Sequence, residues 1–196
     1  MKVNEIFYSL QGEGHFAGTA AVFVRFSGCN LRCPFCDTAH EDGREMTVDE
    51  ILREVCVFPA RHVVITGGEP ALQITGELLR ALRGEGFFVQ METNGTVALP
   101  ADAVELVNWI TCSPKLGRTD IQRVDELKVL YTPETEDVLE QWAMLGMENG
   151  AVLSLQPCDT GDAERNRVIT AGVVEYVKAH PQWHLSLQTH KLIDIR

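Results

Sequence analysis

The chain has 196 residues, of which 45% are hydrophobic and 23% charged, and its formal net charge is −11. These values are typical of a soluble globular protein, and we expect a single domain over residues 1–196. No two Lys or Arg residues are adjacent, which argues against nucleic-acid binding, and no apolar run is long enough to predict a membrane span. The first residues lack an apolar signal core, so we expect a cytoplasmic protein.

Apolar, β-branched runs alternate with helical patterns along the chain. Strands are predicted over residues 20–27, 62–67, 87–93, 107–113, 126–131, 151–156 and 184–189. Helices are predicted over 47–57, 71–83, 134–145 and 161–179, and the first begins with a capping-box pattern, Thr47 with Glu50 three positions on. Such alternation is typical of a parallel sheet covered by helices. Because a complete eightfold barrel takes about 250 residues, we expect an α/β fold: a partial, open TIM-like barrel of about six parallel strands with covering helices.

Polar or Gly/Pro-containing segments follow all but one of the predicted strands. They are GCNLRC, TGGEP, ETNG, CSPK, QPCD and QTHK. In parallel α/β folds the carboxyl ends of the strands lie on one face, and ligand sites form there. The sequence therefore predicts that these segments converge on one site.

Three cysteines, Cys29, Cys33 and Cys36, lie close together in and just after the first of these segments. A [4Fe–4S] cluster usually takes four thiolates, so three would leave one iron open to another ligand. The alternative is a zinc site of the Cys₃His type, completed by His40.

The other three cysteines lie outside this group. Cys56 falls in a helical pattern and Cys112 ends an apolar run, so we expect both to be buried small hydrophobic residues. Cys158 follows a predicted strand. A fourth thiolate from it would close the open iron, and we predict that it is not a cluster ligand.

The spacing Cys29-x₃-Cys33-x₂-Cys36, with Phe35 before the last cysteine, resembles the cluster motif of the radical S-adenosylmethionine (SAM) enzymes. The segment GGEP, residues 67–70, is similar to that superfamily's site for the methionyl amino group. Within the superfamily the chain resembles the 7-carboxy-7-deazaguanine synthase family nearly end to end. The segments that carry this resemblance are FYSLQGEG, VRFSGCNLRCPFCDT, VITGGEPALQ, METNGT, CSPK and the closing LQTHKLIDIR.

The resemblance implies conversion of 6-carboxy-5,6,7,8-tetrahydropterin to 7-carboxy-7-deazaguanine with loss of ammonia, on the route to queuosine and other 7-deazapurines. It implies a [4Fe–4S] cluster, SAM as a regenerated source of a 5′-deoxyadenosyl radical, and Mg²⁺. It also implies a homodimer and a flavodoxin-like electron donor. Two alternatives stay open: an activating enzyme for a glycyl-radical protein, which would share the cluster motif and GGEP, and a zinc-binding interaction module.

The resemblance also assigns residues to the site. Cys29, Cys33 and Cys36 would hold the cluster, and Thr38 would contact Mg²⁺. Substrate contacts are expected from Leu10, Gln11, Gly12, Glu13, Arg25, Thr93, His190 and Arg196. SAM contacts are expected from Phe35, Cys36, Asp37, Gly68, Glu69, Gly95, Ser113, Pro114, Lys115 and Gln156. For each of these the alternative is an ordinary turn or a satisfied structural residue, and no protein nucleophile is expected.

Overall fold

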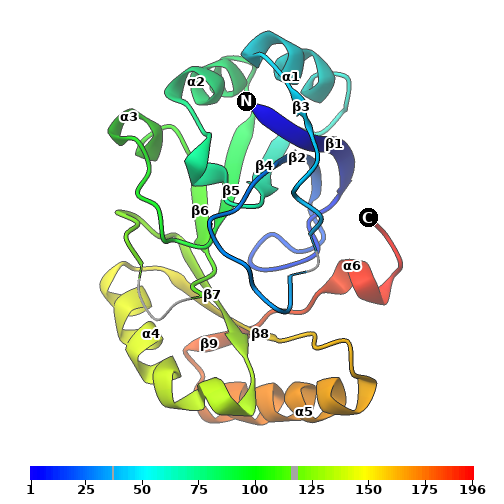
Figure 1. The fold of residues 1–196 in the computed structure, drawn as a ribbon. Helices are drawn as coiled ribbons and strands as arrows, with labels where there is room; N and C mark the ends of the chain where they lie inside the picture. The colour runs from blue at the N-terminus through cyan, green and yellow to red at the C-terminus, as the bar shows by residue number, and fades with distance from the viewer. Residues whose placement is uncertain (37, 116–118) are drawn as a thin grey trace.

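Figure 1 shows the chain in a computed structural model that describes residues 1–36, 38–115 and 119–196. The strands of the described residues form one sheet in the order β3-β1-β2-β4-β5-β6-β7-β8-β9. Neighbouring strands from β2 through β9 run parallel, whereas β1 and β3 are antiparallel to their neighbours. Helices lie on the outside of this curved, open sheet (Figure 1), which confirms the expected fold class.

The strands are β1 (Lys2–Leu10), β2 (Ala20–Phe26), β3 (Arg44–Glu45), β4 (His62–Gly67), β5 (Phe88–Thr93), β6 (Trp109–Cys112), β7 (Glu126–Tyr131), β8 (Val152–Pro157) and β9 (Trp183–Leu185). The α-helices are α1 (Val48–Val55), α2 (Gly76–Gly84), α3 (Ala101–Val104), α4 (Glu136–Glu148), α5 (Ala163–Ala179) and α6 (Thr189–Leu192). Two 3-10 helices, η1 (Pro70–Leu72) and η2 (Pro133–Thr135), precede α2 and α4.

Every predicted strand is present, but some boundaries differ. The strand predicted to end at residue 189 ends at Leu185, and the chain then turns into α6. The helix predicted over 71–83 is divided into η1 and α2, because the Thr75 side chain accepts a hydrogen bond from the Leu78 N–H and caps α2. The capping box of Thr47 and Glu50 at the start of α1 is confirmed.

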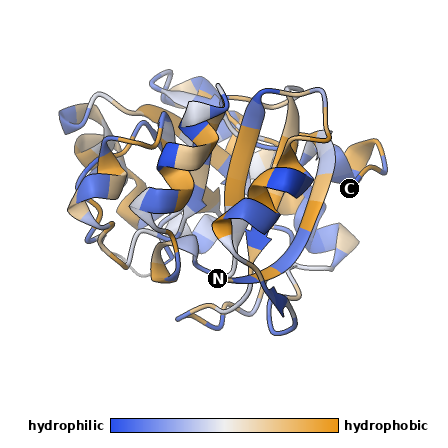
Figure 2. Ribbon diagram, turned by 90° about the horizontal axis from the view of Figure 1, so that it is seen from above, coloured by the Kyte–Doolittle hydropathy of each residue, from blue (hydrophilic) through white to orange (hydrophobic). Residues whose placement is uncertain are grey.

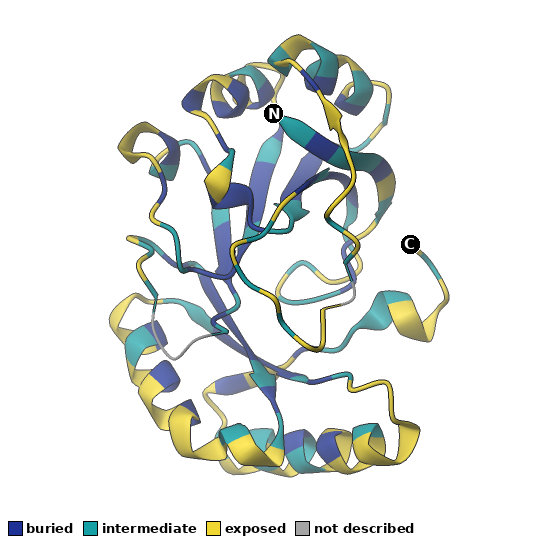
Figure 3. Cartoon of the chain, in the orientation of Figure 1, coloured by how far each residue is buried: buried dark blue, intermediate teal, exposed yellow. Residues whose placement is uncertain are grey.

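Two apolar cores fill the space between the sheet and its helices. The first packs α1 and α2 against β2, β4 and β5, and the second packs α4 and α5 against β7 and β8. Figure 3 shows the strands buried and the outer sides of the helices exposed, and Figure 2 shows hydrophobic residues along the strands. Cys112 is fully buried, as expected, whereas Cys56 is exposed, because it is the C-cap of α1 and does not lie on its buried face.

The loop between β1 and β2, residues 11–19, crosses the inside of the sheet. His15 stacks on Trp109 with ring centroids 4.7 Å apart, and the Phe16 ring packs edge-on against His62 and Phe88. His62, Phe88 and Trp109 are the first residues of β4, β5 and β6. The loop therefore covers the amino-terminal ends of these strands with aromatic rings and leaves their carboxyl ends open.

No helix in the described ranges is both long enough and apolar enough to cross a membrane.

Candidate active site

Two adjoining cavities lie at the carboxyl ends of the strands. The smaller, of about 230 Å³, is lined by residues from all six polar segments that were predicted to converge. The larger, of about 640 Å³, extends from the same place towards β1 and the C-terminal residues. We call them the cysteine cavity and the β1 cavity. The side chains that line both are Glu13, Thr38, Thr66, Glu92, Lys128 and Lys191.

The three clustered cysteines line the cysteine cavity from one closed loop. The Gly28 N–H donates to the His40 carbonyl at 2.7 Å and joins the two ends of this loop. Inside it, the Cys36 N–H donates to the Cys33 carbonyl at 3.1 Å, and the Leu31 N–H donates to Cys29 Sγ at 3.4 Å. All three thiols are free, and Cys36 is exposed. The loop thus presents three separate sulfur ligands towards one space.

These cysteines fit a cluster better than a single ion. Among the described residues, no three His, Cys, Asp or Glu side chains converge closely enough to hold one metal ion. A [4Fe–4S] cluster takes each thiolate on a different iron and therefore accepts wider spacing than zinc does. His40 contributes its backbone carbonyl to the loop closure, and its Nδ1 is buried without a hydrogen-bond partner, but among the described residues His40 and the cysteines do not form a group close enough to hold one zinc ion.

The GGEP segment touches the cysteine loop directly. The Glu69 N–H donates to the Gly28 carbonyl at 2.9 Å, and a Cβ on Gly68 would lie only 1.9 Å from that same oxygen. Gly68 therefore has to be glycine for the two backbones to approach this closely. It lines the cysteine cavity, as a SAM-contacting residue should.

The Glu69 side chain braces the neighbouring loop. It is fully buried, and its carboxylate accepts hydrogen bonds from the Thr93 hydroxyl at 2.7 Å and from the Asn94 N–H at 2.7 Å. Burial raises the pKa of Glu69, and these hydrogen bonds oppose the rise. Thr93 Oγ1 also accepts from the Gly95 N–H at 3.1 Å. The predicted contacts Glu69, Thr93 and Gly95 are thus brought together, with the carboxylate directed at the β5 loop.

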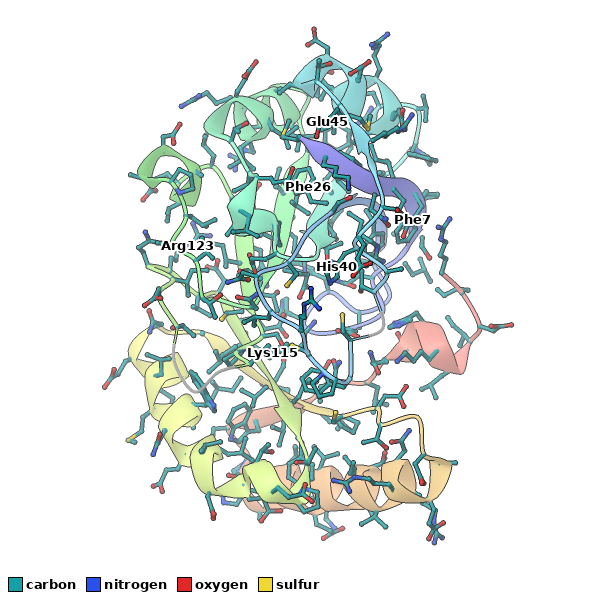
Figure 4. All side chains as sticks on the ribbon, in the orientation of Figure 1. Phe7, Phe26, His40, Glu45, Lys115 and Arg123 are labelled. Carbon is teal, nitrogen blue, oxygen red and sulfur yellow. The ribbon has the colours of Figure 1, made fainter. Side chains whose placement is uncertain are left out.

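The remaining predicted SAM contacts gather around Lys115. Its ammonium donates to Ser113 Oγ at 2.8 Å and lies 5.4 Å from the centre of the Phe35 ring (Figure 4). Burial lowers the pKa of Lys115, and the nearby charge of Lys128 lowers it further. Gln156, across the cavity, accepts from Ser186 at 2.8 Å. Pro114 is buried beside them, and Asp37 lies outside the described residues.

The β1 cavity collects the predicted substrate residues other than Thr93. They are Leu10, Gln11, Gly12, Glu13, Arg25, His190 and Arg196. Arg25 pairs with Glu5 through Nε at 2.8 Å and donates from Nη1 to Thr38 Oγ1 at 3.2 Å. Arg196 also pairs with Glu5, and its guanidinium lies 4.9 Å from the centre of the Phe7 ring (Figure 4).

The C-terminal residues are fastened across this cavity by polar contacts. The N–H and the hydroxyl of Thr189 both donate to the Gly12 carbonyl at 2.8 Å. The Gln188 amide donates to Glu13 at 2.8 Å, and Lys191 pairs with Asp159 at 2.8 Å. A Cβ on Gly12 would collide with the His190 ring at 2.1 Å, so the two segments meet closely.

Comparison with known proteins decides the family. Residues 23–157 match the model of the radical SAM superfamily. Over all of this chain and 98% of its own length, a 7-carboxy-7-deazaguanine synthase of Bacteroides thetaiotaomicron is 52% identical. One from Bradyrhizobium diazoefficiens is 40% identical over 99% of this chain and 98% of its own. This chain belongs to the 7-carboxy-7-deazaguanine synthase family. The crystal structure of QueE from Escherichia coli agrees, with 30% identity, a TM-score of 0.75, and coverage of 96% of this chain and 94% of that one.

Membership in this radical SAM family implies a [4Fe–4S] cluster and SAM. The three free thiols on one loop and the adjoining cavity, with the half-buried ammonium of Lys115, fit both groups. A sulfonium amino acid offers a carboxylate to such a cation, and the cluster takes one thiolate on each of three irons.

Three charged residues of this family member were not predicted from the sequence. Glu92 and Lys128 line both cavities, and Glu126 is fully buried beneath them. Glu126 accepts hydrogen bonds from the His15 N–H at 2.9 Å and from the Thr111 hydroxyl at 3.0 Å, so it anchors the loop that carries Glu13. The sequence does contain one signal for two of them. Glu126 and Lys128 are charged residues at alternate positions of an otherwise apolar strand, so their side chains lie on the same face of the sheet.

Proposed function

We propose that the chain converts 6-carboxy-5,6,7,8-tetrahydropterin to 7-carboxy-7-deazaguanine with release of ammonia. This proposal is supported by the side chains that line both cavities, which we call the shared wall: Glu13, Thr38, Thr66, Glu92, Lys128 and Lys191. Cofactor in the cysteine cavity and a bicyclic substrate in the β1 cavity would meet across Thr38, Glu92 and Lys128. Radical transfer needs such direct contact between reactants held in one orientation and away from water.

The cysteine cavity would hold the cofactors. Cys29, Cys33 and Cys36 would bind the cluster, and Lys115 with Ser113 would meet the carboxylate of SAM. When bound, these groups supply a 5′-deoxyadenosyl radical that removes a hydrogen atom from the substrate. The residues of the chain orient SAM, and the Gly68 backbone allows it to lie close to the cysteine loop.

The β1 cavity would hold the pterin. Arg25 suits the substrate carboxylate, because Glu5 fixes its Nε and turns the Nη edge towards Thr38 and the cavity. Burial tends to raise the pKa of Glu13, but the charge and hydrogen bond of Lys128 lower it to about 2. Glu13 is therefore ionised at neutral pH and can accept hydrogen bonds from pterin N–H groups. His190 and Arg196 would cover the ring.

We infer that Mg²⁺ binds at Thr38. This hydroxyl lies at the boundary of the two cavities and next to Arg25, where the substrate carboxylate would arrive. A hydroxyl is a weak ligand, but Mg²⁺ keeps several waters and takes substrate oxygens to complete its octahedral shell. The metal would then hold the carboxylate so that the substrate carbon bearing it faces the cysteine cavity.

We further propose one domain over residues 1–196, a homodimer, a flavodoxin-like electron donor and a cytoplasmic location. One sheet contains every described strand, which supports the single domain. Tyr8 on β1 is exposed and suits contact with a second copy. Cys36 and Arg32 are exposed on the cysteine loop, so a redox partner could approach the cluster. Six free cysteines suit a reducing compartment.

The test is an anaerobic assay of the reconstituted and reduced protein. SAM, Mg²⁺ and 6-carboxytetrahydropterin are supplied, and products are followed by mass spectrometry. We expect a product that lacks the mass of ammonia, with SAM not consumed. Cys33→Ala should abolish both the cluster and the product. Cys56→Ala is the matched control, because Cys56 is exposed at the end of α1, and it should keep both.

Three outcomes would contradict the proposal in different ways. SAM cleavage without the expected product would leave the radical chemistry standing and remove the substrate assignment. Hydrogen abstraction from a glycine of an added protein would favour the activating-enzyme alternative. A colourless protein that retains zinc after reconstitution would exclude the cluster itself.

A further inference from the structure

We propose that Lys128 is a positioning residue that holds the carboxylates of Glu13 and Glu92 in the shared wall, so that the wall presents hydrogen-bond acceptors to the pterin ring. This inference rests on the proposed function and extends it to a residue without an assigned role. In this role Lys128 acts through the two carboxylates and not on the reacting atoms themselves.

Lys128 lies in the middle of β7, between two residues of the second core, Leu127 and Val129. Because side chains alternate along a strand, its own side chain points to the opposite, inner face of the sheet. It is 4% exposed, yet it lines both cavities. An ammonium group in such a place is strongly unfavourable unless charges and hydrogen bonds compensate it.

Two carboxylates from different parts of the chain provide this compensation. Lys128 Nζ lies 2.7 Å from Glu13 Oε2, on the β1–β2 loop, and 3.0 Å from Glu92 Oε2, on β5. Burial works to lower the pKa of Lys128, but the charges of Glu13 and Glu92, and more weakly that of Glu126, raise it overall. The residue is therefore a permanent cation that ties the loop to the sheet.

The other carboxylate oxygens are held by amides. Glu13 Oε1 accepts from the Gln188 side chain at 2.8 Å. Glu92 Oε1 accepts from Gln90 at 2.8 Å and from Gln11 at 3.2 Å. All of these neighbours donate, so both carboxylates are fixed as acceptors. The 2-amino group and ring N–H of a pterin are donors, and this wall matches them.

Without the Lys128 cation the two carboxylates of the shared wall would no longer present only hydrogen-bond acceptors. Two partly buried carboxylates side by side repel each other, and desolvation already raises the pKa of Glu92. One of them would take a proton or move away. A protonated carboxyl would then direct a donor at the N–H groups of the pterin, and the match would become a clash. Whether these carboxylates of the shared wall accept hydrogen bonds from the substrate or donate them to it thus depends on Lys128.

Calorimetric titration of the reconstituted protein with 6-carboxypterin and, separately, with SAM tests this role. Lys128→Met should weaken the binding of 6-carboxypterin about 10- to 100-fold, the loss expected for hydrogen bonds to a charged group. SAM affinity should stay near its original value, and Lys128→Arg should recover much of the pterin affinity. The matched control is Lys178→Met, which removes an exposed ion pair with Glu175 on α5.

A double variant separates positioning from simple charge balance. Lys128→Met with Glu92→Gln removes the cation together with one of its two carboxylate partners and should restore thermal stability without restoring pterin binding. If stability and pterin binding return together in this variant, Lys128 only balances charge, and the inference is wrong. It is equally wrong if Lys128→Met binds 6-carboxypterin as the original chain does. If the original chain neither binds 6-carboxypterin nor forms product, the proposed function fails first and this inference falls with it.

Discussion

Replacement of Gly68 by alanine should separate the GGEP segment from the cysteine loop. The new Cβ would lie 1.9 Å from the Gly28 carbonyl oxygen and 2.9 Å from the Cys29 nitrogen. Both are backbone atoms, so no side chain can rotate away to relieve the contact. The φ of Gly68 is not in the left-handed region, which means that the variant tests this contact alone.

The magnitude follows from that geometry. The two backbones must separate by roughly 1 Å, and overpacking of this kind costs about 1–3 kcal/mol. The hydrogen bond from the Glu69 N–H to the Gly28 carbonyl, 2.9 Å long, is lost as well and is worth about 1 kcal/mol. The movement occurs next to Cys29, so we expect it to displace a cluster ligand more than it destabilises the fold.

The assay measures iron and sulfide per chain after anaerobic reconstitution, the dissociation constant for SAM, and the melting temperature. Gly68→Ala should lower cluster content and weaken SAM binding, with a fall of a few degrees in melting temperature. Gly84→Ala is the matched control. Nothing lies within 4 Å of its new Cβ, at the end of α2, so it should be neutral or slightly stabilising. A Gly68→Ala protein with full iron and unchanged SAM affinity would refute the reasoning.

Three further predictions concern other parts of the chain. Thr47→Ala removes the capping box of α1 and should lower the free energy of unfolding by about 1 kcal/mol in denaturant titration. An unchanged free energy of unfolding would mean that the capping box does not stabilise the fold. Cys158→Ala should keep the iron content of the reconstituted protein, and a loss would make Cys158 a ligand. Hydrogen bonds from Lys191, Gly161 and Asn166 lower the pKa of Asp159 from 3.8 to about 2. This stabilisation is complete above pH 4 and is lost as pH falls towards 2, so Asp159→Asn should flatten that part of the acid-unfolding curve; an unaltered curve would exclude the effect.

The sequence predicted the parallel part of the fold because apolar, β-branched runs alternate with helical patterns along the chain. The run 62–67 packs on both of its faces: Val63 and Ile65 lie in the core with α1 and α2, and Val64 packs against Phe7 and Phe23 on the inner side. The antiparallel strand β1 was missed because a register shift between Val3 and Glu5 interrupts its alternation. The four-residue helices α3 and α6 are too short for a periodic pattern to be visible.

The candidate site was predictable where residues follow strand ends and less so elsewhere. The cysteines and Gly68 carry a motif, and the structure places them around one cavity. Glu69 also carries a motif, but its fully buried carboxylate braces Thr93 and Asn94, a role that depends on which loop lies next to it in space. Lys128 lies within a strand, and its two partners come from distant segments, so no local pattern reveals them.

The open edge of the barrel has a consequence for how substrate and product enter and leave the site. In the described part of the chain, β9 and the β1–β3 edge share no ladder, and the Thr189 contacts to the Gly12 carbonyl lie between them. Widening the molecule at this seam breaks a handful of polar contacts, whereas parting β4 from β5 would break a continuous ladder. We therefore expect a bicyclic substrate to enter and a product with a smaller ring to leave sideways at this seam, while the parallel strands beside the cysteine cavity stay paired.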